Sequence, residues 1–221
     1  MPVEAMPATG TDHHLSIWDT DGHTLWELWD AVRAPDGTWS AGAGAKWDTT
    51  STGYSTGHNT LSARAYGGAA IAGAILYDEL AAGHIDHALG MAYPKSRGQA
   101  YAQGLGVDGI TPNIASHSDN DAAPGRNGDE NMPEGARFRL KASVDVAARC
   151  GANATCKIIG KTLQTYGAYV VDNAAVATFY AEVLTNHPGK SWSGLLSATD
   201  ARAFLADDFE VLALPSTLTQ F

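Results

Sequence analysis

The chain has 221 residues, of which 44% are hydrophobic and 17% charged, and its formal net charge is -10 at pH 7. Such an acidic surface repels nucleic-acid phosphates and anionic lipid heads, and no cluster of Lys and Arg reverses it locally, so we expect no nucleic-acid partner. No run of about 18 apolar residues occurs, so we expect no membrane insertion. The opening MPVEAMPATGTDHH lacks the basic and apolar regions of a signal peptide, and we interpret it as a trimmed mature start or as residues added for expression.

The first half of the chain predicts strands and turns. Residues 1–12 are expected to be disordered, and the two histidines that follow are interpreted as the frayed start of a strand. Two aromatic-rich runs flank the DTDG sequence at 19–22, which is typical of a β-hairpin. A second turn is predicted at 35–37, a strand over 38–47 and a long polar loop over 48–68.

The next segments alternate between order and irregularity. Residues 69–82 predict a buried strand followed by a helical turn, and 84–93 predict another strand. The stretch 94–135 is rich in Pro, Gly and polar residues, so we expect a long excursion over one face of the sheet. Residues 135–142 alternate between polar and apolar side chains, which is typical of an antiparallel strand.

The last third predicts helices between strands. A helix is expected from Ala154 to Tyr166, with Gly167 as its stop, because its apolar residues recur on one stripe. A strand is predicted at 168–171, and a second helix is predicted to begin near Ser197. The last predicted element is a strand over 209–214. Together these elements predict a mostly-β chain with one domain over 13–221: an antiparallel β-sandwich of jelly-roll type with two or three short helices.

The only cysteines are Cys150 and Cys156, in the sequence RCGANATCK. Two cysteines are too few for a structural zinc site, and their spacing is not that of a C-x-x-C redox motif. We therefore predict a disulfide that closes a short loop. A disulfide indicates an oxidising compartment, so the protein is expected to be secreted.

Five segments resemble, in order and spacing, an uncharacterised family of secreted bacterial proteins. They span roughly residues 12–180 and read DHHLSIWDTDGHTLWELWDA, WSAGAGAKWD, AGAILYDELAAGHIDHAL, MPEGARFRLKAS and LQTYGAYVVDNAA. Members of this family tend to be exported by soil bacteria, often beside carbohydrate-handling genes. The resemblance implies secretion and one continuous domain, but it implies no activity and no catalytic residues.

Carboxylates at expected strand ends are the first candidates for catalysis. Glycoside hydrolysis needs two carboxyl groups, and the acids so placed are Asp48, Asp78, Glu79 and Asp172. Each of them also fits a structural role as a cap or turn residue. We hypothesise a groove between the 48–68 and 94–135 loops in which Glu79 and Asp172 form the catalytic pair, with His87 beside them as a third catalytic group.

No metal site is expected. On a strand, His84 and His87 would point to opposite faces, so they could not share an ion. The sequence SHSD at 116–119 lacks the elbow motif of serine hydrolases. Calcium is an alternative at Asp119, Asn120 and Asp121, although a solvated loop explains this run as well.

Tryptophan is concentrated in the first quarter of the chain, and its apolar face stacks on sugar rings as readily as it packs in a core. Trp47 and Tyr54 flank the polar loop, so they are the preferred ligand contacts. The full set of expected substrate-binding residues is Trp47, Asp48, Tyr54, His117, Arg137, Tyr166 and Asn173.

These patterns predict a secreted carbohydrate-active enzyme that cleaves a polysaccharide or oligosaccharide. A glycoside hydrolase is favoured because an acidic protein suits a neutral glycan. A polysaccharide lyase is the alternative, and its candidate residues are Arg137, Arg139, Asn173, His87 and Tyr166. A non-catalytic carbohydrate-binding or cell-surface module is the third interpretation, but such modules rarely contain a loop as long as 94–135.

Overall fold

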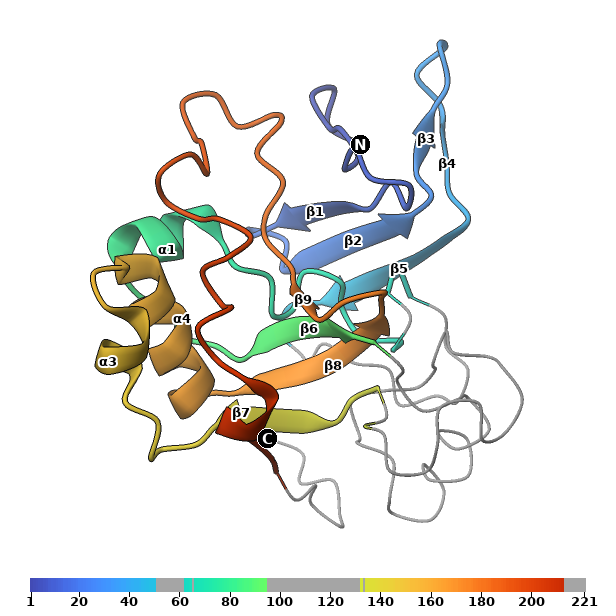
Figure 1. Ribbon diagram of the computed structural model, residues 1–221. Helices are drawn as coiled ribbons and strands as arrows, with labels where there is room; N and C mark the ends of the chain where they lie inside the picture. The colour runs from blue at the N-terminus through green and yellow to red at the C-terminus, as the bar shows by residue number, and fades with distance from the viewer. Residues whose placement is uncertain (51–61, 65, 95–131, 133, 213–221) are drawn as a thin grey trace.

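A computed structural model describes residues 1–50, 62–64, 66–94, 132 and 134–212. Strands dominate this part of the chain, in a three-stranded sheet, a five-stranded sheet and a small separate hairpin. Figure 1 shows the three-stranded sheet above the five-stranded one, with the short helices gathered at one side of both. The mostly-β class with short helices is therefore confirmed, whereas the jelly-roll topology is not.

The three-stranded sheet begins with the predicted hairpin. Strands β1 (Leu15–Asp19) and β2 (Thr24–Trp29) are antiparallel, and β2 also pairs with β5 (Ala43–Asp48). The Asp19 side chain accepts a hydrogen bond from the Gly22 amide at 2.9 Å, which closes the turn in the way Asp residues favour. The second predicted turn joins β3 (Val32–Arg33) to β4 (Trp39–Ser40).

The five-stranded sheet has the order β10-β7-β8-β6-β9. Its strands are β6 (Leu89–Tyr93), β7 (Arg137–Leu140), β8 (Ala168–Asn173), β9 (Thr178–Phe179) and β10 (Phe209–Val211). Strands β6 and β8 are parallel, so the sheet is mixed rather than antiparallel as expected. Parallel neighbours need a long connection, here residues 94–167, and pattern reasoning between adjacent segments does not detect such pairs.

Three short helices accompany the sheets: α1 (Tyr77–Ala82), α3 (Val146–Cys150) and α4 (Ala154–Thr165). The side chain of Asn153 caps α4 by accepting a bond from the Cys156 amide, and the predicted helix from residue 154 is confirmed. The predicted disulfide is also confirmed: Cys150 and Cys156 join α3 to α4 with 5.6 Å between their Cα atoms.

The C-terminal part differs from prediction around Ser197. Its amide donates to the Asp200 side chain at 2.7 Å, as a helix start would, but the segment continues as turns. A short 3₁₀ helix, η1 (Ala206–Asp208), follows and leads directly into β10. The capping hydrogen bond is therefore present, but no α-helix follows it, because the sequence after Ser197 has no long apolar stripe.

One face of the five-stranded sheet packs against the helices. Leu89 of β6, Leu140 of β7 and Val170 of β8 are buried in one cluster with Ile159 and Leu163 of α4. No helix in the described residues is long and apolar enough to cross a membrane.

The segment from Tyr66 to Gly73 passes close to β8 and β6, and the Tyr66 amide donates to the Val171 carbonyl of β8. Gly73 has a φ of +83°, and a Cβ atom there would meet the backbone of Gly90 in β6, so this close approach requires glycine. The N-terminal segment also has a defined place: Ala5, within the stretch expected to be disordered, is buried beside Leu15 and Ala31.

Candidate functional site at the carboxyl end of β8

A β-bulge aims Asp172 away from the helical core. Met91 pairs with Val170 and Ala92 pairs with Asp172, so Val171 is the extra residue on β8. Val170 lies in the core with the helices, whereas Asp172 meets Arg64 on the other side of the sheet. Bulges of this kind re-aim a side chain next to functional sites.

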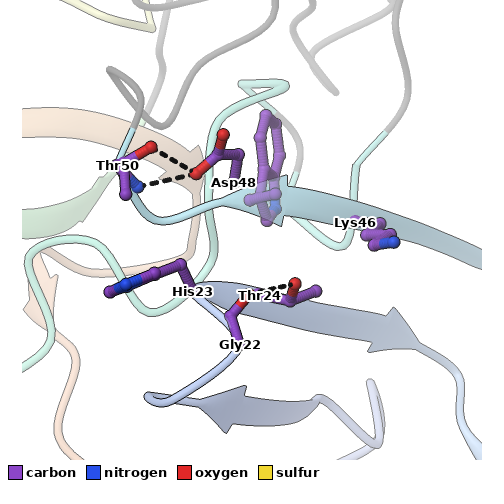
Figure 2. A pocket seen from close by; sticks show the side chains of 7 residues that line it. Gly22, His23, Thr24, Lys46, Asp48 and Thr50 are labelled. Carbon is purple, nitrogen blue, oxygen red and sulfur yellow. Dashed lines mark hydrogen bonds between the residues drawn. The ribbon is translucent and has the colours of Figure 1, made fainter.

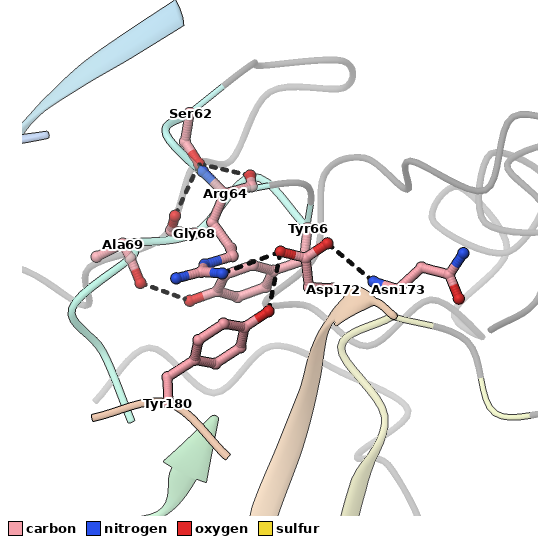
Figure 3. A network of polar contacts seen from close by, with 8 residues as sticks. All are labelled: Ser62, Arg64, Tyr66, Gly68, Ala69, Asp172, Asn173 and Tyr180. Carbon is pink, nitrogen blue, oxygen red and sulfur yellow. Dashed lines mark hydrogen bonds and ion pairs between the residues drawn. The ribbon is translucent and has the colours of Figure 1, made fainter. Parts of the chain in front are cut away.

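The Asp172 carboxylate has charged and neutral partners (Figure 3). Its Oδ2 accepts hydrogen bonds from Arg64 Nη1 at 3.0 Å and from the Tyr180 hydroxyl at 3.1 Å. Its Oδ1 accepts the Asn173 amide at 2.8 Å. The Arg64 guanidinium also lies over the Tyr180 ring, 3.8 Å from the ring centroid. The Arg64 and Asp172 side chains are only 7% and 17% exposed.

The backbone around Arg64 is fixed by its neighbours. The Ser62 hydroxyl lies 2.8 Å from the carbonyl oxygens of both Arg64 and Gly68. The Tyr66 hydroxyl donates to the Ala69 carbonyl at 3.0 Å, and the Tyr66 amide donates to the Val171 carbonyl of β8. Arg64 is therefore placed on the end of β8 by a rigid segment.

His14 is electrostatically coupled to this group. Burial lowers the pKa of His14, and the Arg64 cation lowers it further, against the opposing charges of Asp12 and Asp172. The same surroundings raise the pKa of Tyr180, mainly through burial. We call His14, Arg64, Asp172 and Tyr180 the Arg64–Asp172 cluster. In it the imidazole is held neutral and the phenol is held protonated.

Two polar atoms of the cluster lack a partner. His14 Nδ1 and Arg64 Nε are both buried, and neither has a hydrogen bond within the described part of the chain. A buried donor without a partner costs about 1–3 kcal/mol, so this arrangement is not one that stability alone favours.

Glu27, on β2, is another buried carboxylate, and both of its oxygens accept hydrogen bonds. Its side chain accepts the Ser16 hydroxyl, the Trp47 indole and the amides of Ala70 and Ile71. With 0% of its surface exposed, Glu27 ties the three-stranded sheet to the segment that carries Arg64. The sequence reasoning did not single out this residue.

A shallow depression of about 530 Å³ lies at the turn between β1 and β2 (Figure 2). It is lined by Gly22, His23, Thr24, Lys46, Trp47, Asp48 and Thr50. Two expected substrate-binding residues, the neighbours Trp47 and Asp48, both line this depression. The Thr50 hydroxyl and amide donate to Asp48 Oδ1 at 2.6 and 2.9 Å and lower the pKa of this carboxyl.

The expected catalytic trio is divided between two places. His87 Nε2 lies 3.0 Å from Glu79 Oε2, so these two residues do form a pair. Leu89, just after His87, pairs with Ala168 at the start of β8. Asp172 is four residues farther along β8, or about 13 Å at the rise of a strand. Glu79 and Asp172 therefore lie at opposite ends of the parallel pair and do not form one carboxylate couple.

The remaining expected residues have mixed positions. Arg137 donates to the Tyr166 carbonyl and lies over the Tyr169 ring, so it fixes the start of β8. Arg139 pairs with Glu210 on the surface, and Asn173 adjoins Asp172. Tyr54, His117 and the calcium candidates at 119–121 lie outside the described residues.

Three members of the cluster were missed by sequence reasoning: His14, Arg64 and Tyr180. Arg64 did leave a signal, because it is the only Lys, Arg, Asp or Glu between residues 49 and 68. A lone cation in a polar, Gly-rich segment is worth testing as an anchor or ligand contact. Tyr180 and His14 carried no comparable signal, because only the fold brings them to Arg64.

No group of three His, Cys, Asp or Glu side chains that could hold a metal ion is found among the residues with described positions. Comparison of the sequence with protein-family models, and of the chain with curated proteins and solved structures, finds no match. The case for function therefore depends on the geometry of the Arg64–Asp172 cluster and the Trp47 depression.

Proposed function

We propose that this protein is a carbohydrate-cleaving enzyme whose active site is the Arg64–Asp172 cluster. The observation that carries the proposal is the contact of a carboxylate, a guanidinium and a phenol at one strand end, with the imidazole of His14 coupled to them through charge. These groups supply a negative charge, a positive charge, a proton donor and a proton acceptor, which is the set that cleavage of a glycosidic bond requires.

The Trp47 depression supports a carbohydrate as the substrate. It combines an indole face with the polar side chains of Lys46, His23 and Thr24, and sugar sites combine stacking with hydrogen bonding in this way. Glu27 bonds both the Trp47 indole and the Ala70 amide, so the depression is rigidly connected to the segment that carries Arg64. One extended glycan could contact both places.

The Cys150–Cys156 disulfide supports an extracellular location for this activity, because disulfides persist in oxidising compartments. The location of the active site differs from the groove that we expected around Glu79. Glu79 lies on α1 and forms a partly exposed ion pair with His87.

A non-catalytic glycan-binding module is the second candidate, and the exposed tryptophans favour it. Trp18, Trp26 and Trp29 on the three-stranded sheet are 52%, 38% and 41% exposed, and Lys46 lies over the Trp26 ring. A binding module would hold a glycan on this sheet without using the Arg64–Asp172 cluster.

Release of reducing ends from a panel of neutral and acidic polysaccharides separates the two functions. We expect cleavage by the wild type and a loss of about 10²- to 10⁴-fold in turnover for Tyr180→Phe, which removes one hydroxyl. Tyr77→Phe is the matched control, because Tyr77 lies on α1 against Trp192. Binding of a polysaccharide without any cleavage would reject the enzyme and leave the module.

A further inference from the structure

The unpartnered donor of Arg64 defines the kind of ligand that the cluster can take. Arg64 uses Nη1 for Asp172, and its Nε remains buried without a partner in the described part of the chain. On a guanidinium, Nε and Nη2 form the fork that binds a carboxylate through two parallel hydrogen bonds. The Nε donor of the Arg64 fork therefore has no acceptor among the residues that the structure describes.

The guanidinium is also held in one orientation. The Tyr180 ring lies 3.8 Å from it on one side, and the Asp172 carboxylate fixes one end at 3.0 Å. The Arg64 amide donates to the Ser62 hydroxyl, and the Tyr66 amide donates to the Val171 carbonyl of β8. A fork that cannot rotate selects a planar, doubly accepting group over a single hydroxyl, because only the planar group satisfies both donors.

From this geometry we infer that the substrate is an acidic polysaccharide, and that Arg64 binds the carboxylate of a uronic acid unit while the chain is cleaved by β-elimination. The inference rests on the proposed function, because it specifies the substrate class and the reaction of the same site. It goes beyond that function in excluding hydrolysis as the main reaction.

The groups around Arg64 fit the proton transfers of this reaction. A carboxylate bound to a guanidinium makes the adjacent C5–H bond more acidic, since the negative charge that develops on its oxygens is neutralised. His14 Nδ1 has no hydrogen bond within the described residues, and the His14 imidazole interacts electrostatically with Arg64 and Asp172, so we assign this atom as the acceptor of the C5 proton. Tyr180 keeps its proton and is the acid.

The bonds balance without a cofactor or an added water molecule. The C5–H electron pair becomes the C4=C5 double bond, and the C4–O bond breaks with its electron pair on the leaving oxygen. Tyr180 gives its proton to that oxygen, while the proton from C5 rests on His14. Transfer of a proton from His14 to the phenolate through solvent restores both groups, so nothing is oxidised or reduced.

The acidic surface of the protein does not conflict with an acidic substrate. The net charge of -10 slows the approach of a polyanion, but solvent screens such long-range repulsion within about 8 Å at physiological salt. The decisive contact is the buried fork of Arg64. We therefore expect activity on polyuronates to rise with salt concentration up to moderate ionic strength.

The test uses alginate, polygalacturonate and hyaluronan beside polygalacturonate whose carboxyl groups have been reduced to alcohols. We expect ultraviolet absorption from the new C=C bond with at least one polyuronate and none with the reduced polymer. Arg64→Lys, which keeps the charge but lacks the fork, should lower kcat/KM about 10- to 100-fold, as loss of a charge-assisted hydrogen bond implies.

The controls separate this inference from the proposed function. Lys161→Ala removes an exposed cation of α4 and should leave elimination unchanged. Release of reducing ends without a C=C bond, or equal cleavage of the carboxyl-reduced polymer, would overturn elimination while the enzyme stands. No cleavage of any polysaccharide would reject the enzyme itself. Thermal unfolding of Arg64→Lys establishes that a lost activity is not a lost fold.

Discussion

Glu27 bonds to the amides of Ala70 and Ile71 and Asp172 bonds to Arg64, and these two carboxylates differ in how completely their groups are hydrogen-bonded. Glu27 is fully buried and accepts four hydrogen bonds, all from neutral donors. Asp172 is partly open and binds a guanidinium whose Nε has no partner in the described part of the chain. Both are acids in a mostly-β protein, yet only Asp172 belongs to a group in which a donor, Arg64 Nε, has no hydrogen bond among the described residues.

This difference distinguishes a structural group from a functional one. A structural polar group gains most when every donor and acceptor is paired, because each unpaired buried group costs free energy. A ligand-binding group must keep some capacity for the ligand, and the fold bears that cost. Glu27 fits the first description, and the Arg64–Asp172 cluster fits the second.

Glu27→Gln tests the structural role of Glu27, and it should have the largest effect on stability. An amide presents a donor to groups that are themselves donors, so at least two of the four bonds are lost. Each bond to a charged group is worth about 1.5–3 kcal/mol, so the free energy of unfolding should fall by about 3–5 kcal/mol. Urea unfolding measures this change, and a fall below about 1 kcal/mol would show that Glu27 is not the anchor we describe.

Asp172→Asn should have a smaller effect on stability and a larger one on turnover. Removing one partner of a buried ion pair costs about 3–5 kcal/mol, but the open side of Asp172 admits water, so we expect about 2 kcal/mol. Turnover of a polysaccharide should fall at least 10²-fold, because Arg64 and Tyr180 lose their common partner. Loss of stability equal to that of Glu27→Gln, with full activity in the folded fraction, would reverse our assignment.

His14 should make stability depend on pH in the acid range. Its pKa in the folded protein is lowered by burial and by Arg64 from the ordinary 6.5, so the unfolded chain binds a proton more readily. The contribution of His14 is therefore complete above pH 6.5 and is lost as the pH falls below it. His14→Gln should flatten this part of the stability curve; identical curves for the two proteins would contradict the coupling.

Glu79→Gln should have the smallest effect. The Glu79 and His87 side chains are 28% and 32% exposed, and ion pairs of this kind contribute less than about 1 kcal/mol. Turnover should stay near that of the wild type, because Glu79 lies at the other end of β8 from Asp172. A fall of 10²-fold in turnover without unfolding would move the active site back to the α1 end of the sheet.

Local patterns in the sequence predicted local structure well. The Asp19–Gly22 hairpin, helix α4 with its stop at Gly167, and the Cys150–Cys156 disulfide all follow from neighbouring residues, and the structure confirms them. The parallel pairing of β6 and β8 and the bulge at Val171 did not follow. Both depend on segments that are far apart in the chain.

The same dependence on segments far apart in the chain explains which residues of the site could be identified from the sequence. Asp172 was identified because an acid at a strand end is a local feature. Its supposed partner Glu79 was also expected near a strand end but lies on α1, because sequence alone does not say which ends of which elements meet. Arg64 and Tyr180 reach Asp172 from separate segments, and His14 is coupled to it through charge.

A crystal structure of Tyr180→Phe with a bound polyuronate oligosaccharide tests the central claim most directly, since this variant keeps the site but removes the acid. We predict a uronate carboxylate on Arg64 Nε, with C5 facing His14 Nδ1 and the chain continuing toward Trp47. An oligosaccharide bound beside Glu79 and His87, or on the exposed tryptophans with Arg64 untouched, would contradict the assignment of the Arg64–Asp172 cluster as the active site.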